Sequence, residues 1–277
     1  MKRALAVQID RCRDKLTKAD QRLLDVLLRD PAQAAMLSAS EVAREAGVHA
    51  AAAVRLAQKL GFDGYLGMRS ALRSEVVASD SARRIAETLA GAEGNLLASL
   101  VASEVDTLLG LVQHLDQGAI ETVARMLLKA RGVTLCAQGN AVVLAHLLDR
   151  RLRRSGFRTS VATGQGRELA EQLMPLGRGD VLVCFAFRRL QREIVGALEH
   201  ARHVGARTLV IADQIARRIT PAPDYVLAAP RGRSEEFLTL TVPMAVCNAL
   251  VLTIARVDGG QSVSTLDALE KLSGRFD

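Results

Sequence analysis

Two hydrophobic patterns divide the chain, and each predicts a different kind of domain. Up to about residue 118, apolar residues recur every three or four positions, which is the spacing of amphipathic helices. Beyond that point, short apolar runs alternate with helical segments, which is typical of a parallel sheet covered on both faces. The sequence therefore predicts an α/β protein, with an all-α N-terminal domain and then a three-layer α/β/α domain containing five parallel strands.

The N-terminal domain is predicted to begin with a short helix over residues 4–16 and a clearer helix after Thr17. Thr17 is a suitable N-cap, and Asp20 lies in the first turn, where an acidic residue is favourable. The expected buried stripe of this helix is Leu23, Leu24, Leu27 and Leu28. Asp30-Pro31 ends the helix, and a short helix is expected around Ala32–Met36.

The stretch Ser38–Leu60 is predicted to form two short helices joined by a tight turn. Ser38 and Glu41 have the spacing of a capping box, and Gly47 can end the first helix in a left-handed conformation. The residues of the second helix expected to face inward are Val54, Ala57 and Leu60. Two helices around a glycine turn form a helix-turn-helix pattern, whose second helix enters the DNA major groove. Other helix pairs share this pattern, so alone it leaves DNA binding open.

A helix over about residues 66–77 is expected to close this domain, and residues 80–118 are interpreted as a helical connector. Asn95 can cap a helix there. Its broad apolar stripe consists of Leu96, Leu97, Leu100, Val101, Val105, Leu108, Leu109 and Val112. Such a stripe must be covered, either by the next domain or by another copy of the chain. The pattern does not separate these two cases, and we expect a homodimer or homotetramer.

The C-terminal domain is predicted over residues 119–277, after an N-terminal domain over residues 1–79. Its expected strands are Val133–Ala137, Arg158–Ala162, Val181–Phe187, Thr208–Ala212 and Tyr225–Ala228. Its expected helices are Val142–Arg154, Arg167–Leu173, Gln191–Val204, a short turn near Ile215, and Phe237–Ala255.

Composition excludes several function classes. No run of about 18 uncharged apolar residues occurs, so we expect no membrane partner. The four cysteines have no paired spacing and the five histidines do not cluster with them, so we expect reduced thiols in a cytoplasmic protein with no metal or other cofactor. The formal net charge of +7 permits an electrostatic attraction to DNA phosphates. The absence of Trp and the few aromatic residues argue against single-strand binding by base stacking.

Two segments resemble known domains. The run from Leu16 to Val76, with its LSASEVAREAGV and KLGFDGY segments, resembles the N-terminal domain of the RpiR family of bacterial transcription regulators. The five strands that follow resemble a sugar isomerase (SIS) domain, which is the second domain of those regulators. Together the two resemblances cover most of residues 16–256. They imply a DNA-binding transcription regulator that binds double-stranded operator DNA and responds to a small molecule.

The predicted recognition helix departs from the family pattern. Family members usually begin this helix with a Ser N-cap followed by polar residues and Thr, whereas this chain has His49 and then four alanines. Ala50 and Ala51 can contact only a thymine methyl group, so polar readout is assigned to His49, Arg55, Gln58 and Lys59. Ser38 and Ser40 are placed for phosphates, and we expect Arg55 or Lys59 on a phosphate as well.

The effector site is expected beyond the carboxyl ends of the strands, where ligands of open parallel sheets bind. The candidate residues are Gln138, Gly139, Asn140, Arg188, Arg189, Gln191 and Ser234. SIS domains that hold phosphorylated sugars typically carry a Ser-x-Ser-Gly-x-Thr run after the third strand, and here those hydroxyls are missing. The adjacent Arg188 and Arg189 can bind a carboxylate or phosphate bidentately. They can also serve only the fold, through solvent or a Glu partner.

The sequence thus favours a regulator that senses a small anionic metabolite, either a phosphorylated sugar or a carboxylate or amino-acid type. Two alternatives remain. A sugar-phosphate isomerase needs a general base, for which Glu168, Glu235 and Glu236 are the nearby carboxylates. A DNA-binding protein whose second domain serves only for dimerisation is also consistent with the degenerate loops.

Overall fold

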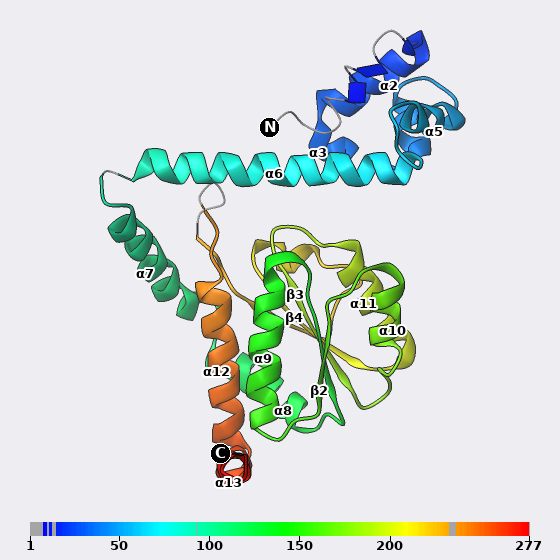
Figure 1. The fold of residues 1–277 in the computed structure, drawn as a ribbon. Coiled ribbons are helices and arrows are strands. Elements are labelled where there is room, and N and C mark those ends of the chain that lie inside the picture. The colour runs from blue at the N-terminus through cyan, green and yellow to red at the C-terminus, as the bar shows by residue number, and fades with distance from the viewer. Residues whose placement is uncertain (1–7, 10, 13–14, 93, 233–236, 277) are drawn as a thin grey trace. The chain divides into compact units, whose positions relative to one another are not determined.

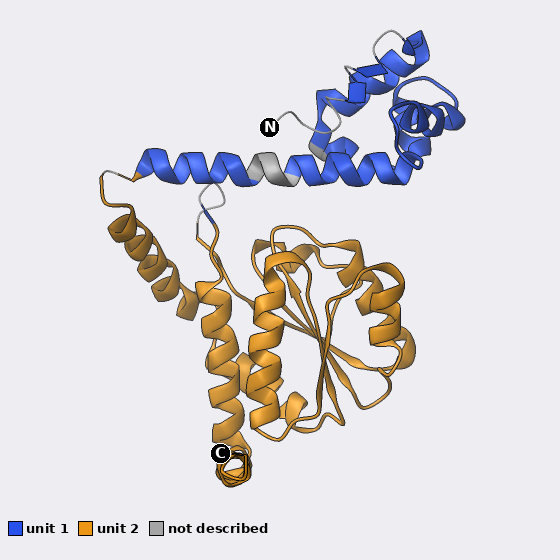
Figure 2. Ribbon diagram, viewed as in Figure 1, with its two compact units in different colours: residues 1–91, 235–237 blue, residues 92–234, 238–277 orange. Residues whose placement is uncertain are grey.

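The computed structural model describes residues 8, 9, 11, 12, 15–92, 94–232 and 237–276. It divides into two compact units (Figure 2). Unit 1 comprises Met1–Gly91 with Glu235–Phe237, and unit 2 comprises Ala92–Ser234 with Leu238–Asp277. The helix predicted over residues 4–16 falls largely outside the described residues.

Unit 1 is helical, as predicted. Its helices are α2 (Lys18–Arg29), α3 (Pro31–Ala34), α4 (Ala39–Glu45), α5 (Ala50–Lys59) and α6 (Tyr65–Gly91). Capping residues set two of these starts. Thr17 and Asp20 form a capping box at α2, and Ser38 and Glu41 form one at α4. Gly47, with φ of 64°, ends the first helix of the helix-turn-helix pair as predicted.

The core of unit 1 is built from the inner faces of α2, α4, α5 and the first turns of α6. Its largest fully buried side chains are Leu23, Leu27, Leu56, Leu60 and Met68. Two predicted core residues are exposed instead: Leu28 is 50% exposed and Val54 is 38% exposed. In α5, the buried positions are Ala52, Ala53, Leu56 and Ala57. The inward face of α5 is therefore rotated relative to the prediction, and Val54 lies on the outward side.

The boundary region differs from the predicted connector. The helix expected over residues 66–77 continues to Gly91 as α6, without a break near residue 80. The next helix, α7 (Leu96–His114), is capped by Asn95, whose side-chain oxygen accepts a hydrogen bond from the Ala98 N–H at 3.0 Å. This cap was predicted from the sequence.

Unit 2 contains one parallel sheet of five strands in the order β2-β1-β3-β4-β5 (Figure 1). The strands are β1 (Val133–Cys136), β2 (Thr159–Ala162), β3 (Val181–Ala186), β4 (Arg207–Ala212) and β5 (Tyr225–Ala228). Every predicted strand is confirmed to within one residue at each end. The strand order reverses beside β1, so β1 and β3 are hydrogen-bonded neighbours. Their following loops therefore emerge side by side at the carboxyl edge of the sheet.

Helices cover both faces of this sheet, which confirms the predicted three-layer architecture. One layer contains α8 (Gln117–Leu128), α9 (Val142–Arg154) and α12 (Thr241–Val257); the other contains α10 (Gly166–Leu173) and α11 (Arg192–Val204) (Figure 1). The short helical turn near Ile215 is a 3₁₀ segment, Gln214–Arg218. Two helices were not predicted from the sequence: α8, and α13 (Gln261–Ser273) at the end of the chain.

Helix α7 keeps much of its apolar stripe uncovered. Leu108 and Leu111 pack against the core of unit 2, and α7 contacts α12. The exposed members of the stripe are Leu96, Leu97, Val101, Val105, Leu109 and Val112. By length and composition, α7 is long enough and apolar enough to cross a membrane, with a mean hydropathy of 1.4. Helices α12 and α13 reach the required length and apolar character only as a pair, and that pair is bent by 101°. Glu104 and Asp106 lie in the middle of α7, and charges there are costly in a bilayer.

Candidate DNA-binding helix and effector site

The exposed face of α5 carries most of the predicted DNA-reading residues. His49, Ala50, Ala51, Arg55 and Gln58 are all exposed. The Nδ1 atom of His49 accepts a hydrogen bond from the Ala51 N–H at 3.3 Å, so His49 is the N-cap of α5. In this tautomer the Nε2 atom carries the proton and can donate outward.

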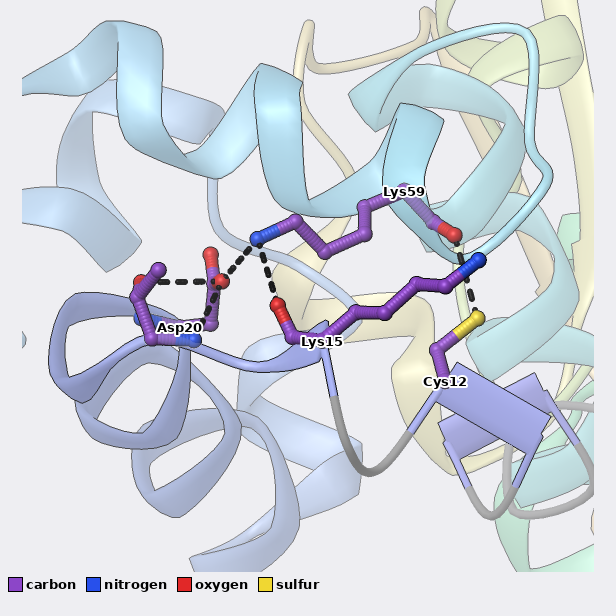
Figure 3. Close-up of polar contacts among 5 residues, drawn as sticks. Cys12, Lys15, Asp20 and Lys59 are labelled. Atoms are coloured by element: carbon purple, nitrogen blue, oxygen red, sulfur yellow. Dashed lines mark hydrogen bonds and ion pairs between the residues drawn. The ribbon is translucent and has the colours of Figure 1, made fainter.

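The side chain of Lys59, which was predicted on an exposed face together with Arg55, is bound to other residues of unit 1. Its ammonium group binds the carboxylate of Asp20 and donates a hydrogen bond to the backbone carbonyl of Lys15 at 3.1 Å (Figure 3). The Cys12 thiol donates to the Lys59 carbonyl oxygen at 3.2 Å (Figure 3). The last turn of α5 is therefore tied to α2 and to the segment before it.

Asp20 is the buried member of this ion pair, with a side chain 6% exposed against 28% for Lys59. Burial raises the pKa of a carboxyl group. Here the hydrogen bond from Lys59, together with those from the Thr17 N–H and hydroxyl group, outweighs burial and holds the pKa of Asp20 below its ordinary value. The carboxylate is thus the stable form at neutral pH.

Ser38 and Ser40 lie together at the start of α4. The Ser38 Oγ caps the helix by accepting from the Glu41 N–H at 3.3 Å, and it is 3.1 Å from the Ser40 Oγ. Hydrogen bonds with Ser38 hold the pKa of Glu41 below its ordinary value. Ser40 is exposed and remains a candidate for a phosphate contact, whereas the Ser38 hydroxyl already serves the helix.

At the carboxyl edge of the sheet, the structure brings together six of the seven predicted effector residues. Gln138, Gly139 and Asn140 follow β1, and Arg188, Arg189 and Gln191 follow the adjacent β3. Ser234 lies outside the described residues, as do Glu235 and Glu236. Glu168, the remaining carboxylate considered as a general base, is exposed and its side chain accepts from Gln172 at 3.4 Å.

Gln138 has a structural contact at this edge. Its side-chain amide donates to the Gly164 carbonyl oxygen at 2.9 Å, and the Gly164 N–H donates to Gln172 at 2.9 Å. These bonds connect the loop after β1 with the loop after β2. Gly139, with φ of 59°, and Asn140 are exposed beside it.

Arg188 is the one non-glycine residue with a positive φ among the described residues, at 65°. This conformation costs free energy for a side chain other than glycine, and such costs persist where the surroundings hold the backbone. The Arg188 N–H donates to both carboxylate oxygens of Asp213, at 3.0 and 2.9 Å. Asp213 follows β4 and is buried. It therefore fixes the loop that presents Arg188 and Arg189.

A buried arginine from the loop after β5 completes this edge. The Arg231 side chain is 9% exposed, and one of its guanidinium nitrogens lies 3.9 Å from the Asp213 carboxylate. It donates to the Thr239 and Leu238 carbonyl oxygens at 2.7 and 2.9 Å, and its guanidinium lies 5.0 Å from the centroid of the Phe187 ring. Three arginines and one carboxylate give the edge a net positive charge.

Asp213 and Arg231 were not predicted as site residues. Asp213 directly follows an apolar strand, so the rule applied to β1 and β3 would have found it after β4. Arg231 carries no comparable signal, because its partners lie seven and eight residues further along the chain.

Comparisons with known proteins agree with this division into two domains. Residues 3–80 match the model of the helix-turn-helix domain of the rpiR family, and residues 126–253 match the model of the SIS domain. An uncharacterized HTH-type transcriptional regulator of Haemophilus influenzae is 28% identical over an alignment of 227 residues, and the match covers 76% of this chain and 75% of that protein.

Two solved structures with the same fold are informative. The sugar isomerase domain of an RpiR transcription factor from Sphaerobacter thermophilus is 25% identical, has a TM-score of 0.57, and covers 63% of this chain and 97% of its own. The Vibrio vulnificus NanR protein complexed with ManNAc-6P is 15% identical, has a TM-score of 0.58, and covers 98% of this chain and 99% of its own. At that identity, the second likeness shows the fold alone.

A helix-turn-helix domain followed by a SIS domain defines a class of DNA-binding transcription regulators. The chain belongs to the RpiR family of this class.

Proposed function

We propose that this regulator senses a small anionic metabolite at the carboxyl edge of its SIS domain, and that the bound metabolite changes its affinity for operator DNA. The observation that carries the proposal is the loop after β3, where Asp213 holds Arg188 in a left-handed conformation beside Arg189. A backbone cost of this kind, at the edge where ligands of parallel sheets bind, is typical of a binding loop.

The charges at this edge favour an anion. Arg231 lies close to the buried carboxylate of Asp213 and offsets its negative charge. The remaining charges of Arg188 and Arg189 therefore make this edge positive. A guanidinium group binds a carboxylate or phosphate through two parallel hydrogen bonds. The Vibrio vulnificus protein was solved with a phosphorylated amino sugar, which keeps this class among the candidates. Because the usual hydroxyl-rich run is absent here, a carboxylate or amino-acid type of effector is an equal candidate.

We assign no catalytic role to this site. Glu168, the described carboxylate that we considered as a general base, is exposed and lies beside Gln172. The Gln138 amide is occupied by the Gly164 carbonyl oxygen. The arrangement thus supplies positive charge and fixed loops, which suit binding. We propose a cytoplasmic regulator that needs no cofactor.

On the DNA side, we propose that α5 enters the major groove. His49, Ala50, Ala51 and Gln58 would face the bases, Arg55 would contact a phosphate, and Ser38 and Ser40 would lie near the backbone. Lys59 is excluded from this set because it is bound to Asp20.

We also propose a homodimer or homotetramer in which α7 is covered by a second copy of the chain. Its exposed apolar stripe supports this arrangement, and a helix-turn-helix protein gains specificity by binding two half-sites. No membrane partner is proposed, because Glu104 and Asp106 would be desolvated in a bilayer.

One experiment tests the effector proposal and separates it from both alternatives. Thermal shift of the full chain would be measured against a panel containing inorganic phosphate, sugar phosphates and carboxylate metabolites, and DNA binding would then be measured with each hit. A sensor gives a shift and a changed DNA affinity. Turnover of a sugar phosphate would indicate an enzyme, and no shift with any anion would indicate a domain used only for dimerisation.

A further inference from the structure

The outward face of α5 presents more apolar surface than the sequence pattern indicated. Ala50, Ala51 and Val54 are exposed there together with Arg55 and Gln58. Val54 is 38% exposed, whereas the opposite face is closed, with Ala53, Leu56 and Ala57 at most 1% exposed. Val54 lies one helical turn after Ala50 and Ala51, so these three side chains form one patch, which we call the α5 apolar patch.

Valine is not the residue that helix propensity favours at this position. Its β-branched side chain has a lower helix propensity than alanine, and alanines precede it in the same helix. More than a third of its surface stays in contact with solvent, whereas the core side of α5 is closed without it. Fewer polar side chains than predicted are available to contact bases, since Lys59 is bound to Asp20.

We propose that Val54 is a specificity-determining residue that selects thymine through its 5-methyl group, with Ala50 and Ala51 beside it in the α5 apolar patch. The thymine methyl is the largest apolar group on the base edges of the major groove, where most other groups are hydrogen-bond donors and acceptors. An apolar patch therefore distinguishes thymine from other bases without a hydrogen bond. This inference rests on the proposed placement of α5 in the groove.

The test begins with selection of the preferred duplex from a randomised pool by the full chain. Each thymine of that duplex is then replaced singly by deoxyuridine, which removes the methyl group and keeps the base pair. We expect about fourfold weaker binding at one or two positions in each half-site, the equivalent of one buried methyl group. In the Val54→Ala variant, the same replacements should change the affinity much less, so the two changes are coupled.

Leu28→Ala is the matched control, because Leu28 is an exposed apolar residue on a different helix of unit 1. This variant should retain the full preference for thymine over deoxyuridine. If wild-type protein binds both duplexes equally, or if Val54→Ala retains the preference, the inference is wrong while DNA binding by α5 stands. If no duplex is enriched, the proposed DNA binding itself fails. Absence of a thymine preference in the wild-type scan overturns the inference even if a variant misfolds.

Discussion

The Lys59 ammonium group, in the last turn of α5, is bound to the buried carboxylate of Asp20 in α2. The two residues are 39 positions apart in the sequence. This ion pair, together with the hydrogen bond from Lys59 to the Lys15 carbonyl oxygen, fixes the end of the proposed recognition helix against the rest of unit 1. We therefore expect Lys59 to position α5 and not to contact DNA.

Replacing Asp20 with Asn should destabilise unit 1 by about 1–2 kcal/mol, because Lys59 loses a charged partner. The pKa of Asp20 is lowered in the folded protein, so its stabilising contribution is complete above the unfolded value of about 3.9. That contribution is lost as the pH falls through the lowered pKa. Urea unfolding between pH 3 and 7 measures this. Asp25→Asn, at an exposed site on the same helix, should change little.

Arg55→Ala should weaken binding to all DNA sequences alike, because a phosphate contact carries no base information. The slope of log K against log salt should become shallower by about 1. Fluorescence anisotropy on specific and scrambled duplexes at several salt concentrations measures both quantities. Arg29→Ala, at an exposed arginine on α2, serves as the control. A loss confined to the specific duplex would show that Arg55 reads a base.

Ala50→Glu should abolish operator binding, since a carboxylate at the start of α5 would be repelled by the DNA phosphates. The neutral variant Ala50→Gln separates charge from size and should retain part of the affinity. Both substitutions are at an exposed position, so circular dichroism should show an unchanged fold. Undiminished binding by the Glu variant would mean that α5 lies outside the groove.

Arg188→Ala and Arg188→Gly should both weaken the response to an anionic effector by about ten- to hundred-fold, because each removes the guanidinium group. They should differ in stability. Glycine adopts the positive φ of 65° without a Cβ clash, so the Gly variant should be about 1 kcal/mol more stable than the Ala variant. Thermal melts with and without inorganic phosphate or a metabolite hit compare the two. An equal effector response in wild type and both variants would place the binding site elsewhere.

Leu109→Glu should convert the protein to a monomer, because Leu109 is 68% exposed within the apolar stripe of α7 and a carboxylate would be buried at the proposed interface. Gln113→Glu, at an exposed polar position on the same helix, is the control and should remain associated. Light scattering at micromolar concentration distinguishes the two. A wild-type chain that is monomeric under these conditions would contradict the proposed assembly.

The sequence pattern predicted most of the fold, because apolar and polar positions are clearly distinguished along most of the regular elements. The strands β3 and β4 are nearly continuous apolar runs, and the ends of all five strands of unit 2 were placed to within one residue. In α5, four successive alanines do not distinguish apolar from polar positions, so the pattern did not show which side of this helix is buried. Leu56 is buried there and Val54 is not. Helix α13 was not predicted, although Leu266, Leu269 and Leu272 in it recur at a helical spacing.

The candidate site was less predictable, because its geometry depends on distant contacts. Arg188 was selected from its place after a strand, but its left-handed conformation depends on Asp213, 25 residues further on. Lys59 was assigned to DNA because its spacing from Arg55 is helical, and the competing carboxylate of Asp20 lies in another helix. The spacing of apolar residues describes one helix or strand at a time, so it does not predict contacts between elements.

The cysteines provide each unit with its own reporter of opening. Cys12 in unit 1 is partly exposed, whereas Cys136, Cys184 and Cys247 in unit 2 are buried. The hydrogen bond with Cys136, together with burial, raises the pKa of Cys184, and burial raises the pKa of Cys247 to about 12. A thiol reagent attacks the thiolate form, so these thiols of unit 2 should react only when that unit opens. Counting labels against time on the unmodified protein would then resolve a fast event in unit 1 from slow events in unit 2.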